Sequence, residues 1–267
     1  MKTVKMKFFT LVSMSVMSVS VLFGQNISDK RTQAGLTGTF GLNMLRMGTN
    51  KMNANGLGSN VGIGIAVHSA FKNSKNLGLA YGLEFEFGSF KFEPNSTTFY
   101  NYNDKVILSN ENSQDATGTF ELKERTQKPV YLTVPIMFLF RTDFIGDFRY
   151  FGKFGVRNNF LVSNKMNDTG SDLGSTSQNT ELLNMKSNGE TFFYNGSVGM
   201  TAGAEWNFVG STALVAELGY FYGITPLFLD RKVENKTLYT LDSALKPSYF
   251  SNNANLSQIM LKVSILF

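Results

Sequence analysis

Eight segments of the sequence alternate apolar and polar residues, and polar stretches rich in Asn, Ser and Gly separate them. Successive side chains of a β-strand point to opposite faces, so this period predicts strands that bury one face. The 25 Gly and 25 Phe, against 5 Pro, also favour sheet over helix. We therefore expect an all-β, up-and-down antiparallel fold of about eight strands. These strands are predicted near residues 34–46, 60–70, 77–92, 126–141, 148–163, 191–208, 212–229 and 255–267.

The direction in which the apolar faces point separates two interpretations. In a soluble sandwich or lipocalin-like barrel they point inward, whereas in a transmembrane barrel they face lipid and the polar faces line the interior. The polar faces here are rich in Gly, Ala, Ser and Thr, which suits a narrow interior better than a solvated surface. The apolar stripes are also long enough for the roughly 9–11 residues that a tilted strand needs to cross a bilayer. We therefore expect a transmembrane β-barrel.

Aromatic residues near the ends of the apolar stripes agree with this interpretation, because transmembrane barrels carry aromatic girdles at both membrane interfaces. These residues are Phe148, Tyr150, Phe192, Tyr194, Trp206, Phe208 and Phe267.

The connections between the expected strands alternate between long and short. Transmembrane barrels have short periplasmic turns and longer external loops, so the alternation predicts a periplasmic N-terminus and external long connections. Residues 94–125 and 164–190 are then external, the second as a mobile polar loop. Val106–Leu108 and Thr119–Leu122 lie in the first of these connections. They either extend the third and fourth strands or form an extra hairpin, which would give ten strands.

The first 24 residues are typical of a secretory signal peptide. Lys2, Lys5 and Lys7 precede an apolar run, and Gly24 provides a small residue at its end. The alternative is an uncleaved anchor helix, but the run is shorter than the roughly 20 apolar residues that such a helix needs. We expect residues 1–24 to be the signal peptide and residues 25–267 to be the outer-membrane barrel domain.

Composition excludes several other classes of protein. The chain has no Cys, so neither a disulfide framework nor a lipoprotein anchor is available. Removing the three signal-peptide lysines reduces the formal charge of +5 to +2, and no basic cluster of the kind that binds nucleic acid remains. After Gly24 no apolar stretch reaches the roughly 18 residues of a membrane helix, so only a closed barrel could cross lipid.

Charged residues of both signs are expected on the polar, inward faces. Buried charges must pair, because an isolated charge carries a large desolvation cost. An eight-stranded barrel is just wide enough for its own side chains to fill it. We therefore expect a salt-bridged plug; the alternative is an ion-selective path, which needs a wider barrel or a mobile plug. The expected network comprises Glu84, Glu86, Arg149, Lys153, Arg157, Glu205, Glu217 and Lys262.

Catalysis has little support in the sequence. His68 is the single histidine, and its neighbour Ser69 points to the opposite face of the strand, so the two cannot form a local dyad. No Cys, His and carboxylate cluster has metal-ligand spacing, and no phosphate-binding loop appears. We expect neither an enzyme nor a cofactor. The alternative is a lipid-modifying hydrolase in which a distant Ser approaches His68.

Two stretches resemble a known family. Tyr131–Phe140, a short turn and Phe151–Val156 are similar to the middle of the PorT-like outer-membrane β-barrel family of Bacteroidota. The C-terminal Leu261, Val263, Ile265 and Phe267 resemble the signal that the barrel-assembly machinery reads. The resemblance implies an outer-membrane barrel. One namesake member takes part in type IX protein secretion, so an accessory role in such a system is an alternative function.

The function expected from the sequence is a structural or interaction protein of the cell outer membrane. Its partners are outer-membrane lipid, the assembly machinery during biogenesis, and a protein that binds the external loops, which are the usual contact surfaces of a rigid scaffold.

Overall fold

The computed structural model describes residues 31–174, 180–187, 190–209, 212–230 and 232–267. Within these ranges it contains 14 strands and two short 3₁₀ turns, η1 (Ser113–Asp115) and η2 (Val233–Asn235). The expected signal peptide lies outside the described residues and stays a prediction. The strands are β1 (Thr32–Met47), β2 (Met52–Ala54), β3 (Gly58–Ala70), β4 (Leu77–Pro94), β5 (Thr98–Asn103), β6 (Val106–Ile107), β7 (Gly118–Arg141), β8 (Phe148–Asp172), β9 (Thr180–Ser187), β10 (Tyr194–Val209), β11 (Thr212–Gly223), β12 (Leu238–Leu241), β13 (Pro247–Phe250) and β14 (Ala254–Leu266).

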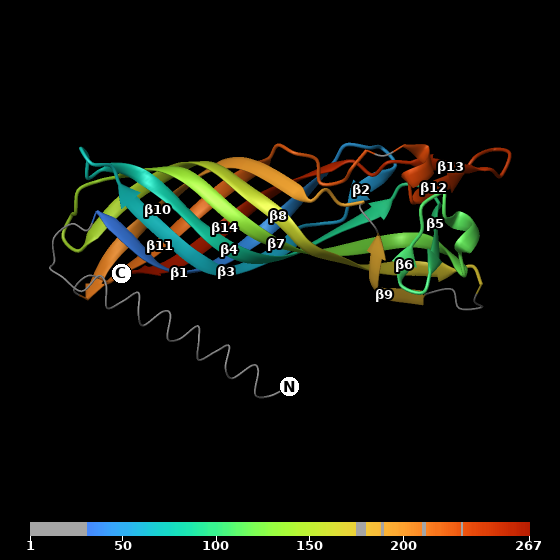
Figure 1. Ribbon diagram of the computed structural model, residues 1–267, viewed down its shortest axis with the longest axis horizontal. Helices are drawn as coiled ribbons and strands as arrows, with labels where there is room; N and C mark the ends of the chain where they lie inside the picture. The colour runs from blue at the N-terminus through green and yellow to red at the C-terminus, as the bar shows by residue number, and fades with distance from the viewer. Residues whose placement is uncertain (1–30, 175–179, 188–189, 210–211, 231) are drawn as a thin grey trace, which may run out of the picture.

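Eight of these strands form a closed antiparallel ring in the order β1, β3, β4, β7, β8, β10, β11 and β14. The ladder from Gly35↔Leu266 to Met47↔Ala254 joins the last strand to the first and closes the ring. Figure 1 shows the strands tilted around the long axis of the molecule. The predicted all-β antiparallel barrel is therefore confirmed. Among the described residues, no helix is long and apolar enough to cross a membrane.

The outer face of this ring is apolar. Phe40, Ile63, Met200 and Leu218 are each between 58% and 67% exposed. Residues of the opposite parity on the same strands, such as Thr39 and Glu217, are buried inside. The apolar stripes thus point outward, as expected for strands that face lipid.

The two ends of the ring differ. At one end, residues 71–76 and 142–147 join strands by short turns, and Gly146 supplies the positive φ (+64°) that the second turn needs. The described N-terminal end of β1 and the C-terminus lie at this same end (Figure 1). At the opposite end the connections are long and run over residues 48–57, 95–117, 173–193 and 224–253. The turn expected at Gly210 lies outside the described residues.

The expected mobile loop at residues 164–190 is wrong for the part that the structure describes, whereas residues 94–125 extend a barrel strand, which was one of the two expected alternatives. β7 begins at Gly118, so Thr119–Leu122 extends the fourth barrel strand, and β8 continues to Asp172. Val106 and Ile107 form β6, which pairs with β5 in a short hairpin. β9 pairs with β8 where the sequence suggested a mobile loop. Together these strands form a structured long-loop extension, which we define as β2, β5, β6, β9, β12 and β13 with the distal ends of β4, β7 and β8.

The long-loop extension contains a second closed ring. β7, β8, β9, β6 and β5 pair in turn, and β5 pairs back onto β7. It contains an apolar core that includes the fully buried Tyr100, Phe120 and Met166. This core is the physical reason that the segments are strands, because inward apolar side chains repay the cost of ordering the chain.

Candidate functional site: the charged lumen

All eight charged residues expected on the inward faces are buried inside the first ring. Four are acids and four are bases, so their formal charges balance. They form three groups that succeed one another along the barrel from the short-turn end, centred on Arg149, Lys153 and Arg157 of β8. These bases are spaced four residues apart, or about 13 Å along a strand, which leaves room for acids between them.

The first group joins Arg149 to Glu205. Arg149 Nε donates to one carboxylate oxygen at 2.9 Å, and Nη2 donates to the other at 2.7 Å. The two residues are direct register partners on β8 and β10, and this is the pairing that strand order alone favours. Gln33 completes the group, since it accepts a bond from Arg149 at 3.0 Å and donates one to Glu205 at 3.2 Å.

Gln33 lies on β1, which is four strands from β8 in either direction around the ring of eight. The hydrogen bond between Gln33 and Arg149 therefore spans the lumen from one wall to the opposite wall. Side chains thus fill the barrel cross-section at this level, as expected at this strand number.

The second group is centred on Lys153 and Glu217, which form an ion pair. Thr201 Oγ1 donates to Glu217 at 3.0 Å, and Lys262 Nζ lies 4.0 Å from the same carboxylate. Lys262 also donates to Glu84 across the lumen. His68 Nε2 lies 3.4 Å from Lys153 Nζ, so the single histidine belongs to this buried network.

The third group places Arg157 between two acids. Its guanidinium pairs with Glu84 at 3.1 Å and with Glu86. Asn60 donates a further bond to Glu86 at 2.7 Å. Glu84 accepts bonds from both Arg157 and Lys262, and it therefore links the second and third groups into one continuous network.

The hydrogen bonds among the neutral polar residues of the lumen were not predicted from the sequence. Beyond the ion pairs, Gln258 donates to Asn43 at 3.0 Å, and Asn159 bonds both Asn195 and Thr133. The same period of two that located the charges places these amides on the inward faces, so alternation is the signal that could have found them. Buried amides of this kind need partners as charges do.

A buried ion pair also lies in the long-loop extension. Arg125 Nε and Nη2 donate to the two oxygens of Asp168, both at 2.8 Å, and Arg125 Nη1 lies 3.6 Å from Glu190. The Arg125 guanidinium carbon lies 5.2 Å from the centre of the Tyr100 ring. Sequence reasoning missed this pair, because it left two alternatives open for residues 94–125 and treated residues 164–190 as a mobile loop.

Burial and the nearby Asp168 carboxylate raise the pKa of Tyr100 above its ordinary value of 10.0. Above pH 10 the unfolded chain loses the Tyr100 proton, whereas the folded chain keeps it. The stability of the extension therefore falls as the pH rises. For this one group, the free energy of unfolding should fall by about 1.4 kcal/mol per pH unit. Alkaline unfolding measures it, and Tyr100→Phe should remove this share of the slope. An unchanged slope in Tyr100→Phe would contradict the assignment.

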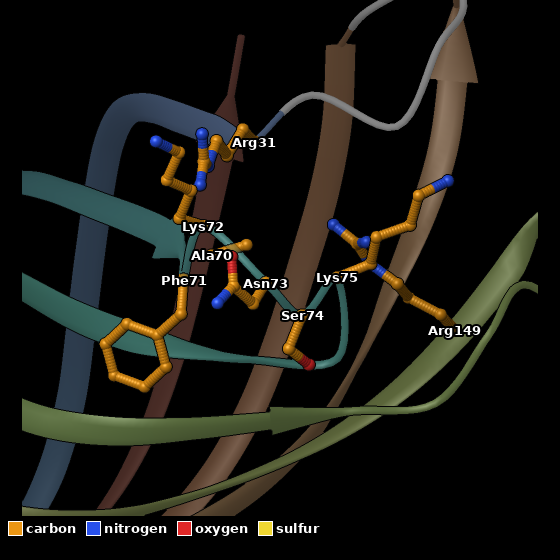
Figure 2. A pocket seen from close by; sticks show the side chains of 8 residues that line it. All are labelled: Arg31, Ala70, Phe71, Lys72, Asn73, Ser74, Lys75 and Arg149. Carbon is orange, nitrogen blue, oxygen red and sulfur yellow. The ribbon is translucent and has the colours of Figure 1, made fainter.

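A basic cavity of about 360 Å³ opens at the short-turn end, and no acid is among the residues that line it. Figure 2 shows Arg31 and Lys72 next to each other and the ring of Phe71 pointing away from these cations. Arg149 lines the cavity and also bonds Glu205, so the cavity lies directly beside the first group of the lumen network.

The described residues contain no group of three or more His, Asp or Glu that could hold a metal ion. The network offers many buried charges, yet each of its acids contacts a base at close range. The ion pairs of the network therefore fill the interior of the barrel and neutralise its charge.

A closed antiparallel ring with an apolar outer face and a polar interior defines a transmembrane β-barrel. The chain belongs to the outer membrane protein beta-barrel domain family, whose model matches residues 23–229. It is therefore a multi-pass protein of the outer membrane. No curated protein matches the chain.

Several solved outer-membrane proteins resemble the structure. Neisserial surface protein A is 8% identical with a TM-score of 0.34, and the match covers 87% of this chain and 97% of that protein. Ail of Yersinia pestis is 12% identical with a TM-score of 0.32, covering 89% and 100%. A major outer membrane protein of Thermus thermophilus is 15% identical with a TM-score of 0.36, covering 88% and 99%.

The lipid-facing stripe of β14 gives a direct test of insertion. Leu261 is 47% exposed on the outer face, whereas its neighbour Lys262 points into the lumen. Leu261→Arg should cost about 2–4 kcal/mol if it lies near the bilayer midplane and should reduce the yield of heat-modifiable barrel in the outer membrane. Ile265→Arg, nearer the short-turn end, should cost less. Outer-membrane yields equal to that of the unmodified protein would contradict a lipid-facing stripe.

The assembly signal expected at the C-terminal end stays a prediction. It comprises Leu261, Val263, Ile265 and Phe267.

The pair Arg149 and Glu205 is suited to a double-mutant cycle. Each single alanine variant leaves the other charge buried, so the double variant should lose less stability than the sum of the two singles. The expected coupling is about 0.5–3 kcal/mol, measured by unfolding in detergent. Additive effects would show that the two side chains do not interact energetically.

Proposed function

We propose that the protein is a closed outer-membrane barrel with a structural or interaction role, and that its long-loop extension is the contact surface. The single observation that carries the proposal is the pair of hydrogen bonds joining Gln33 to Arg149 and Glu205 across the lumen. A barrel filled in this way holds a surface in place rather than passing solute. The ion-selective path considered above would need these contacts to open.

Conductance across a planar bilayer tests the closed lumen. The unmodified protein should give no large, steady conductance, because the ion pairs and the Gln33 bridge occupy the cross-section. The charge-neutral variant Gln33→Ala removes the bridge without removing an ion pair and serves as the comparison. Large, steady conductance in the unmodified protein would overturn the closed-barrel proposal and support the channel alternative.

The long-loop extension is a suitable contact surface because it is folded and displays apolar side chains. Leu173 is 59% exposed, Leu183 49% and Leu245 77%. Leu245 also has a positive φ of +59°, which is uncommon for a residue other than glycine, and it lies in the tight turn after Asp242. Connections held by a rigid scaffold are the usual contact surfaces of a protein.

Labelling of intact cells tests the orientation of this surface. Epitope tags inserted near Asn112 or Gly174 should be reachable from outside, whereas a tag within residues 142–147 should not be. The reverse pattern would overturn the orientation. Crosslinking on intact envelopes followed by purification should then recover a protein partner joined to the extension.

The PorT-like resemblance supports a second candidate function. Its two motif stretches lie in β7 and β8, the longest strands, which run through both rings. We therefore propose membership of the PorT-like subfamily of Bacteroidota and, as the second candidate, an accessory role in type IX secretion. Co-purification with components of a secretion apparatus supports this role; normal secretion in a deletion strain argues against it.

We also propose that the protein is not an enzyme and needs no cofactor. His68 is 3% exposed, and its Nε2 faces the Lys153 ammonium instead of a serine hydroxyl. Ser69 bonds Thr32 at 3.0 Å and so belongs to a different environment. Lipid hydrolysis by the purified protein that His68→Ala abolishes would overturn this proposal and restore the lipid-modifying alternative.

A further inference from the structure

Two lysines face each other on the outer surface of the barrel. Lys128 on β7 and Lys165 on β8 are direct register partners. Both side chains are exposed. Directly opposite residues of an antiparallel pair have Cβ atoms about 4.5–5.5 Å apart, and like charges in this position repel each other. An anion bound between the two ammonium groups would relieve this repulsion.

No protein group supplies that anion in the part of the chain that the structure describes. Neither Lys128 nor Lys165 forms an ion pair there. The next strand provides the contrast, since Lys91 on β4 pairs with Glu124 at 2.9 Å. Glu124 lies four residues from Lys128 along β7, or about 13 Å.

The height of the two lysines on the barrel identifies the anion. Along β7, the lipid-facing stripe ends at Val130, which is paired with the exposed Phe87, and Lys128 lies two residues beyond it toward the long-loop end. Along β8, Lys165 follows Val162, which is 59% exposed at the end of the corresponding stripe. Both lysines therefore lie where the hydrocarbon of the bilayer gives way to head groups.

Aromatic side chains mark the same boundary. Phe160, Tyr194 and Phe193 form a contact chain beside the end of the β8 stripe, with ring centres 5.6 Å and 6.5 Å apart. Phe193 is 62% exposed. Exposed aromatics at the edge of an apolar band belong to an interfacial girdle. Lys165 lies five residues beyond Phe160 along β8, on the head-group side of this girdle, where the phosphates of lipid head groups are the anions at hand.

The geometry points to a lipid-binding site at Lys128 and Lys165 that takes the phosphate of a head group in the leaflet at the long-loop end. Two ammonium groups directed at one phosphate give charge-assisted hydrogen bonds, and the lipid chains then lie along the stripe that ends at Val130 and Val162. The bound phosphate removes the repulsion within the lysine pair. This site is independent of the lumen network and of the proposed contact surface.

Lipid retention measured by native mass spectrometry tests the site, with phosphatidic acid and phosphatidylcholine as probes. The purified barrel should retain phosphatidic acid in preference to phosphatidylcholine. The double variant Lys128→Gln/Lys165→Gln should weaken phosphatidic acid binding by about 30-fold, from the attraction of two lysines to an anionic head group. The matched control is Lys105→Gln/Lys186→Gln, which removes two exposed charges from adjacent positions in the long-loop extension. The control should bind as the unmodified protein does.

Three outcomes would overturn the inference. One is equal retention of the two lipids by the unmodified protein. Another is an equal loss of binding in the control variant, which would show an effect of net charge alone. The third is displacement of phosphatidic acid by inorganic phosphate at the same concentration, which would show a site for free anions. Heat-modifiable gel migration verifies that both double variants are folded, so a loss of binding cannot come from a misfolded barrel.

Discussion

Replacing Arg157 with alanine is expected to destabilise the barrel by about 3–5 kcal/mol, because the change leaves buried carboxylates without their base. Glu84 keeps its contact with Lys262, whereas Glu86 retains only the amide of Asn60. Unfolding in detergent, followed by the heat-dependent shift in gel migration, measures the loss. Arg157→Ala should therefore cost more than removal of Lys262, because Glu84 and Glu217 would each keep another base if Lys262 were removed.

Lys165→Ala is the matched control for this variant. It removes a cation from the same strand, but the side chain is exposed on the outer surface. In detergent without anionic lipid its effect should stay within about 0.5 kcal/mol. Equal stability of Arg157→Ala and Lys165→Ala would refute the claim that the lumen network supports the barrel. The further variant Arg157→Ala/Glu86→Gln should recover part of the loss, because it removes the unpaired charge.

The second large effect is expected in the long-loop extension. Arg125→Leu leaves Asp168 and Glu190 buried without their partner and should cost about 3–5 kcal/mol. The loss should be local, because the first ring keeps all of its own ladders. Hydrogen exchange should increase in β5, β6 and β9 and remain slow in β1, β3 and β14. Slow exchange throughout the variant would contradict the structural role of the pair.

A double variant separates the loss of the ion pair from simple damage to the core. Arg125→Leu/Asp168→Leu replaces both charges by apolar groups, and buried pairs replaced in this way often retain or gain stability. Glu190 remains in the double variant, but it lies 3.6 Å from Arg125 and is less buried than Asp168. The double variant should therefore exchange more slowly than Arg125→Leu.

The barrel itself was predictable because its signal is local. A period of two assigns each residue to a face from its neighbours alone, and it assigned to the inward face eight charged residues that are buried in the structure. The pairing of Arg149 with Glu205 was also accessible, since sequential strands in an up-and-down barrel are neighbours. Contacts across the lumen were not accessible, because they depend on the stagger of the strands. The bond between Gln33 and Arg149 joins residues 116 positions apart.

The long-loop extension was missed for a different reason. Its core residues, among them Phe92, Tyr100, Phe120 and Met166, are separated in the sequence by Asn, Ser and Asp, which are typical of loops. No single segment there shows a long apolar stripe. The strands become stable only because β7 and β8 continue past the membrane boundary and give the shorter strands a sheet to join.

The bond between Lys262 and Glu84 has a consequence for the order of folding. Glu84 belongs to the third strand of the ring and Lys262 to the last, and 178 positions separate them in the chain. Until the last strand arrives, Glu84 and Glu217 lack one of their bases, and the unfinished interior carries an excess of negative charge relative to its final state. Closure of the barrel and neutralisation of its interior therefore depend on the same strand. A chain truncated before β14 would be open along one seam and electrically unbalanced at its centre.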